Sequence, residues 1–151
     1  MPQSLSKMYV HIVFHTKPDH TTIRNQDKSD LYTYIGAIIK DNGSTPILVN
    51  GTENHIHILC ILSKNITLAK LIEEIKRHSS RWITKNDAYY KKFAWQGGYA
   101  GLSVSPSLVD KTKEYIKNQE EHHKKITFKE ELIVLLKKHD IEYNEEYLFR
   151  D

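Results

Sequence analysis

Hydrophobic and polar positions follow two different periods along this chain of 151 residues. Residues 8–16 and 54–62 are almost all apolar or β-branched, and their side chains would alternate between two faces, as is typical of strands. Other segments repeat their apolar positions every three or four residues, as amphipathic helices do. The predicted elements are strands at 8–16, 45–50, 54–62 and within 93–105, helices at 27–42, 67–85, 107–123 and from 127 onward, and a short packed arm at 141–149.

The order of these elements predicts the fold. Strand, helix, strand, strand, helix and strand follow one another, and further helices come after them. This is the split βαβ order of a ferredoxin-like (RRM-like) sandwich, an α+β fold in which helices cover an antiparallel sheet and the first and third strands lie in its middle. We expect one domain over residues 1–151, with a core at about 8–123 and a C-terminal helical extension at about 124–151.

Turn and capping residues refine the boundaries. Asp27 is expected to cap the first helix, and Asn50-Gly51 to form the turn between the second and third strands. Gly97-Gly98 would interrupt the fourth strand. Thr67 is the expected N-cap of the second helix. The last two helices begin with a hydroxyl residue followed three positions later by an acid, the pattern of a capping box: Ser107 with Asp110, and Thr127 with Glu130.

Composition narrows the class of protein. Apolar residues make up 39% and charged residues 27% of the chain, which is ordinary for a folded protein. The net charge of +3 allows an anionic partner without requiring one. Cys60 is the only cysteine, so no intrachain disulfide can form, which fits a reducing compartment. With no apolar run long enough to span a bilayer and no signal-peptide core near the N-terminus, we expect a cytoplasmic protein.

His55 and His57 lie two residues apart on the most apolar predicted strand. They therefore share one face, with their Cα atoms ~7 Å apart. Two neutral imidazoles that converge from one rigid strand are good metal ligands. The alternative is a strand end where two histidines meet solvent, which is the commoner situation when the pair is considered alone.

A stripe of mostly polar residues on the 107–123 helix favours the metal site over this alternative. Its members are spaced four, three, four and three residues apart: Leu108, Thr112, Tyr115, Gln119 and His122. Against a plain core, Gln119 would lack a partner, at a cost of ~1–3 kcal/mol. Against the face that carries the two strand histidines, the polarity of the stripe is explained. The alternative is a packed tyrosine with a hydrated hydroxyl and a surface glutamine.

Other histidines have weaker signals. His11 and His15 share one strand face and could hydrogen-bond to the metal-ligating residues, although a strand residue with its own local partner is the commoner case. His122 and His123 are adjacent, and adjacent helix positions point apart, so we give an independent metal site there little weight.

Several segments together resemble the single-tyrosine HUH transposases of small insertion sequences and their REP-associated relatives. His55-Ile56-His57 fits the histidine–hydrophobic–histidine motif, and residues 115–119 (YIKNQ) look like the helix that carries the nucleophile. Residues 95–105 (WQGGYAGLSVS) are similar to the Trp…Gly-Tyr…Ser-Val-Ser segment, and residues 118–131 to the segment that follows the tyrosine. The resemblance runs from about residue 9 to residue 147, and the order and spacing of the motifs make it specific.

The resemblance implies an enzyme that cleaves and rejoins single-stranded DNA near hairpins. Tyr115 would be the nucleophile, which forms a 5′-phosphotyrosine, and His55, His57 and Gln119 would hold a divalent metal. Mg²⁺ is the expected metal and Mn²⁺ an effective substitute, because imidazole and amide ligands suit borderline metals. The family also implies a homodimer in which the tyrosine helix of one subunit can complete the site of the other, and residues 103–107 could serve as the hinge for that exchange in trans.

Basic residues suggest where DNA could bind. Lys76, Arg77 and Arg81 on the second helix, with Lys17, are candidates for phosphate contacts, and a plain solvated helix face is the alternative for each. Two other functions stay open. One is a catalytically silent or domesticated protein that binds hairpin DNA with the same fold. The other is a ferredoxin-like binding module whose histidines are incidental.

Overall fold

The computed structural model describes residues 2–18 and 21–149. Its strands are β1 (Met8–His15), β2 (Thr45–Gly51), β3 (His55–Leu62) and β4 (Ala100–Val104). Its helices are α1 (Asn25–Asp41), α2 (Leu68–Asn86), α3 (Val109–Lys117), α4 (Gln119–His122), α5 (Phe128–Lys138) and α6 (Glu145–Leu148), with 3₁₀ turns η1 (Ala88–Tyr90) and η2 (Pro106–Leu108).

The strands form one antiparallel sheet in the order β2-β3-β1-β4. This order confirms the predicted α+β fold and places β1 and β3 in the middle of the sheet. The register pairs His15 with His55 and Val13 with His57. Since paired residues in antiparallel strands project to the same side, the histidines of β1 and β3 are brought onto one face.

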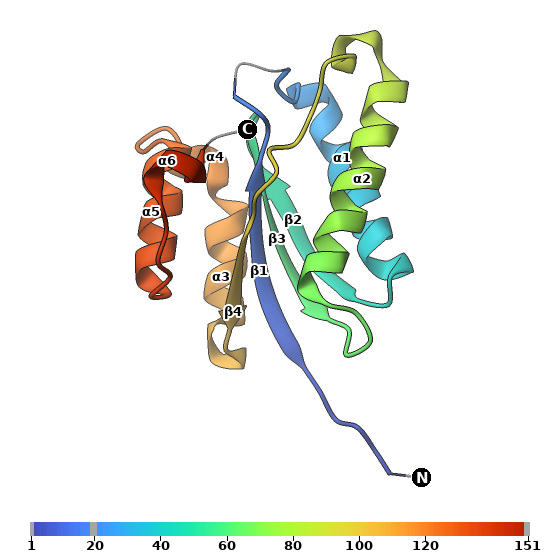
Figure 1. Cartoon of the computed structure of the whole chain (residues 1–151), viewed down its shortest axis with the longest axis vertical. Coiled ribbons are helices and arrows are strands. Elements are labelled where there is room, and N and C mark those ends of the chain that lie inside the picture. Colours follow the sequence, from blue (N-terminus) through green and yellow to red (C-terminus); the bar gives the residue numbers. More distant parts are fainter. Residues whose placement is uncertain (1, 19–20, 150–151) are drawn as a thin grey trace.

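Two helical layers cover the two faces of the sheet. In Figure 1, α1 and α2 lie on one side of it, and α3 to α6 lie on the other. The α1/α2 layer contacts the apolar residues of β1 and β3, among them Ile12, Phe14, Ile56 and Ile58. The second layer has a smaller apolar cluster in which α5 packs against residues of β1 and β4. None of the described helices is long and apolar enough to cross a membrane.

Two predicted boundaries are wrong. Helix α1 begins at Asn25 with Arg24 as N-cap, so Asp27 lies in its first turn and does not cap it. Asn50 and Gly51 are paired strand residues, and the turn that follows is closed by a hydrogen bond from Thr52 N to His55 O (3.0 Å). Strand β4 lies within the predicted range: it begins at Ala100, after Gly97-Gly98, and the segment before it makes one bridge, between Thr16 and Trp95.

The predicted third helix is divided. The capping box of Ser107 and Asp110 is absent, because a 3₁₀ turn that begins at Pro106 leads into α3. Helix α3 ends at Lys117, and α4 begins after Asn118. The side-chain amide of Asn50 donates hydrogen bonds to the carbonyl groups of Ile116 (2.8 Å) and Lys117 (3.4 Å). A strand side chain therefore binds carbonyl groups at the end of α3, where the helix breaks.

Helix α5 has the predicted capping box. Thr127 Oγ1 accepts a hydrogen bond from Glu130 N (3.2 Å), and Glu130 Oε1 accepts one from Thr127 N (3.4 Å). We expect Thr127→Ala to lower the free energy of unfolding by about 1 kcal/mol, measured by urea denaturation. Thr33→Ala, at an exposed position inside α1, is the control and should change it by less than about 0.5 kcal/mol. Equal effects of the two changes would contradict a capping role for Thr127.

Candidate active site

The four residues predicted to form the site lie together within one chain. His55 and His57 on β3 are fully buried, and so is Gln119 at the start of α4. His55 Nε2 lies 2.9 Å from Gln119 Oε1. The half-buried ring of Tyr115 on α3 meets the ring of His57 edge-on, with 5.8 Å between the ring centroids. The helix that carries Tyr115 therefore packs over the histidines of its own chain.

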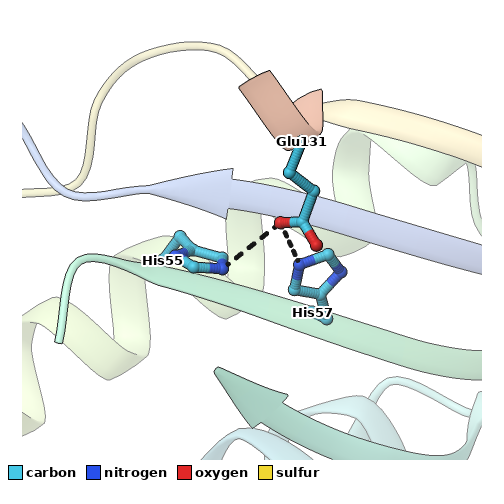
Figure 2. A group of neighbouring side chains, drawn as sticks. All are labelled: His55, His57 and Glu131. Atoms are coloured by element: carbon cyan, nitrogen blue, oxygen red, sulfur yellow. Dashed lines mark hydrogen bonds and ion pairs between the residues drawn. The ribbon is translucent and has the colours of Figure 1, made fainter. Parts of the chain in front are cut away.

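A fifth residue, Glu131, lies at the centre of the group and was not predicted. It comes from α5, and its side chain is almost completely buried. Figure 2 shows its carboxylate above β3, directed toward both histidines. Oε1 lies 3.1 Å from His57 Nε2 and 3.5 Å from His55 Nε2. Oε2 accepts hydrogen bonds from Tyr115 Oη and from Gln119 Nε2, the latter at 2.9 Å.

The sequence held a weak signal for Glu131. The apolar residues of α5 that face the sheet are Phe128, Leu132, Leu135 and Leu136. Glu131 lies three positions after the first of these and four before the third, so it shares their face. An acid on the buried face of a helix needs polar partners, which makes it a candidate for a functional site.

Burial and hydrogen bonding set the charges of the group. Burial, together with the nearby ring of His57, lowers the pKa of His55 to about 3, so His55 is neutral. Burial alone would raise the pKa of Glu131, but hydrogen bonds from His57, Tyr115 and Gln119 outweigh it and hold the pKa below its usual value. Burial and the Glu131 carboxylate raise the pKa of Tyr115. The group therefore combines neutral imidazoles, a carboxylate and a protonated phenol.

The tautomer of His55 directs a lone pair into this group. His55 Nδ1 lies 2.8 Å from Asn54 Oδ1 and 2.8 Å from Thr52 Oγ1. Because the amide oxygen of Asn54 can only accept, the ring proton lies on Nδ1 and the lone pair on Nε2. The amide nitrogen of Gln119 donates to Glu131, so the oxygen of Gln119 faces His55. Three electron-rich atoms, from His55, Gln119 and Glu131, thus converge.

This donor set fits a divalent cation. Metal–ligand bonds of ~2.1 Å place neighbouring ligand atoms ~3.0–3.4 Å apart. The separations of 2.9 Å between His55 and Gln119, 3.1 Å between His57 and Glu131 and 3.5 Å between His55 and Glu131 are close to that spacing. His55, His57 and Glu131 form a group that could hold a metal ion.

Four other histidines lie beside this centre: His11, His15, His122 and His123. His11 Nε2 lies 2.8 Å from His57 Nδ1, where it can fix the orientation of the His57 ring. His15 packs against the ring of Phe128, with 5.1 Å between the ring centroids. The expectation that His122 and His123 point apart is wrong with respect to this site. Their Nε2 atoms lie 3.4 and 3.0 Å from the Glu131 carboxylate, because the short α4 ends beside it.

The predicted DNA-binding residues lie away from this centre, toward the α2 side of the sheet. Lys17, Lys76 and Arg77 line one groove of about 570 Å³, and Arg81 is exposed on α2. Lys76 Nζ donates to the carbonyl groups of Gln96 (2.8 Å) and Gly98 (2.6 Å), and burial lowers its pKa to about 8. Arg77 forms an ion pair with Glu74 (2.7 Å). Lys76 and Arg77 thus already have partners within the protein.

Comparisons with known proteins agree with this fold. The model of a family described as IS200-like transposase matches residues 4–119. A solved structure of a candidate transposase from Deinococcus radiodurans is similar, with a TM-score of 0.61 and 19% identity over 79% of this chain and 98% of that one. A REP-associated tyrosine transposase bound to a REP hairpin has a TM-score of 0.56 and 11% identity over 83% of this chain and 72% of that one. No curated protein matches the chain. Because the family match spans most of its length, the chain belongs to the IS200-like transposase family.

Proposed function

We propose that this transposase cleaves and rejoins single-stranded DNA near hairpins through a 5′-phosphotyrosine on Tyr115. The observation that carries the proposal is the meeting of Tyr115 with His55, His57 and Gln119 at one buried centre. These are the side chains that the family resemblance assigns to the nucleophile and the metal ligands. The similar REP-associated tyrosine transposase, which is bound to a REP hairpin, supports hairpin DNA as the substrate class.

Tyr115 would carry out the chemical step, and the histidines and Gln119 would hold the metal that assists it. Tyr115 Oη attacks the phosphorus atom, a bond forms between them, and the bond from phosphorus to the 3′ oxygen breaks. The phenol loses one proton and the departing 3′ oxygen gains one. His55, His57 and Gln119 would hold Mg²⁺, or Mn²⁺ as a substitute, and the bound metal supplies positive charge against the scissile phosphate. Attack by another 3′-OH on the phosphotyrosine reverses these bond changes and rejoins DNA.

A groove gives DNA a route to the nucleophile. It has a volume of about 460 Å³ and is lined by Tyr115, His11, Lys111 and Lys138, among others. Its lysines can bind phosphates next to the scissile bond. The groove lined by Lys17, Lys76 and Arg77, with Arg81 nearby on α2, would contact the hairpin, mainly through Lys17 and Arg81.

We further propose that the protein is cytoplasmic and works as a homodimer. Exchange of the tyrosine helix between the two subunits would require α3 to leave its own β3.

The experiment is a covalent-adduct assay that also tests the polarity of cleavage. A single-stranded hairpin oligonucleotide is labelled at its 3′ end or at its 5′ end and incubated with the protein and Mn²⁺ before denaturation. We expect the 3′ label to move with the protein and the 5′ label to appear on a shorter fragment with an extendable 3′-OH. A chelator should abolish both products. Hairpin binding without any adduct would instead support a catalytically silent binding protein.

A further inference from the structure

Glu131 lies outside the segment that matches the family, yet its carboxylate occupies the centre of the site. The family match ends at residue 119, whereas Glu131 belongs to α5 in the C-terminal helical extension. The capping box at Thr127 fixes the first turn of α5, and the buried side chains of Leu132 and Leu135 bind the helix to the sheet side. The packing of α5 therefore fixes the position of the Glu131 carboxylate, unlike that of a flexible side chain on the surface.

The two oxygens of Glu131 face different groups. Oε1 faces the imidazole nitrogens of β3, at 3.1 Å from His57 Nε2 and 3.5 Å from His55 Nε2. Oε2 faces the nucleophile helix and its continuation, where Tyr115 Oη and Gln119 Nε2 both donate to it. One carboxylate thus spans the distance between the histidine pair and the tyrosine hydroxyl.

Hydrogen bonds account for Oε2 fully but for the surroundings of Oε1 only in part. Oε2 receives two hydrogen bonds, which satisfies it. Oε1 lies within hydrogen-bond distance of His57 Nε2 (3.1 Å) and His123 Nε2 (3.0 Å). It also lies 3.5 Å from the bare Nε2 lone pair of His55, whose proton is held on Nδ1 by Asn54 and Thr52. Two electron-rich atoms directed at each other repel unless a cation lies between them. A bound cation would make this arrangement favourable.

We propose that Glu131 is a shared carboxylate, which binds the catalytic metal through Oε1 together with His55 and His57 while Oε2 holds the hydroxyl of Tyr115 beside it. The half of this proposal that concerns Tyr115 rests on the proposed function, and the half that concerns the metal does not. A carboxylate oxygen also adds a hard ligand to the imidazoles, which suits Mn²⁺ and Mg²⁺ better than nitrogen ligands alone.

The first test measures metal binding without DNA. Binding of Mn²⁺ to the whole protein is followed by electron paramagnetic resonance for wild type, Glu131→Gln and Glu130→Gln. The last is the matched control, because glutamine can replace glutamate in a capping box. We expect Glu131→Gln to raise the dissociation constant at least ~10-fold and Glu130→Gln to change it less than about 2-fold. Affinity of Glu131→Gln equal to or tighter than wild type would overturn the proposal.

A second measurement applies even if Glu131→Gln does not fold. A crystal structure of the wild-type protein with Mn²⁺ should show Oε1 of Glu131 in the coordination shell with both histidines. A metal held by His55 and His57 with Glu131 outside the shell would overturn the assignment.

The third test separates the two halves of the proposal. At Mn²⁺ concentrations that saturate each protein, we expect Glu131→Gln to form the hairpin adduct at least ~10-fold more slowly than wild type. An unchanged rate would overturn the link to Tyr115. If the wild-type protein binds Mn²⁺ but forms no adduct, and Glu131→Gln loses Mn²⁺ binding, the proposed function fails and the metal half of this proposal stands.

Discussion

Replacing Tyr115 by phenylalanine should abolish the covalent adduct with hairpin DNA, a loss of at least ~1,000-fold, while DNA binding stays within about 2-fold of wild type. The change removes one oxygen, the attacking atom in the proposed reaction, and no other described tyrosine donates to Glu131. The ring remains to pack against His57 and His11, so the fold should persist. Adduct yield on a denaturing gel and hairpin affinity by fluorescence anisotropy provide the two measurements.

Tyr89→Phe is the matched control for this prediction. Tyr89 is exposed, and it lies in η1. The same loss of a hydroxyl there should leave adduct formation unchanged. If Tyr115→Phe still forms an adduct at the wild-type rate, another residue is the nucleophile. If it loses adduct and hairpin binding together, Tyr115 serves binding instead of attack.

The sequence was sufficient to predict those parts of the site that depend on regular periodicity. The alternation along β3 placed His55 and His57 on one side, and the spacing of three and four placed Tyr115 and Gln119 on one stripe. Gln119 still reaches His55 although the helix is broken at Asn118, because helical hydrogen bonds continue on both sides of the break, from Asn118 N to Glu114 O and from His122 N to Asn118 O. The sheet order followed from the sequence of elements alone.

The other parts of the site depend on long-range contacts that no local pattern carries. Glu131 is 74 residues from His57, and only the packing of α5 on the second face of the sheet brings them together. At the break at Asn118, the carbonyl group of Ile116 is bound by the side chain of Asn50, which comes from β2. His122 and His123 reach one carboxylate because their helix is short and ends beside it. Each of these features required the tertiary arrangement.

Gly51 shows that a glycine predicted to form a turn can be required for a different structural reason. The dipeptide Asn50-Gly51 predicted a turn, but Gly51 is paired with Ile56 inside the hairpin. A Cβ atom at residue 51 would lie 2.1 Å from His55 O and 3.1 Å from Ile56 Cα, and both are backbone atoms. A glycine is required here because two strands approach closely, and not because the chain turns.

Gly51→Ala should therefore lower the free energy of unfolding by about 3 kcal/mol, since the two strands must separate to accommodate the methyl group. The shift would also disturb the turn in which Thr52 bonds to both the backbone and the ring of His55, so Mn²⁺ affinity should fall as well. Urea denaturation and Mn²⁺ titration measure the two effects. Gly97→Ala is the control, because a Cβ atom there meets nothing within 4 Å. A Gly51→Ala protein as stable as Gly97→Ala would show that the hairpin can widen without cost, and that the close approach of β2 to β3 does not fix the position of His55.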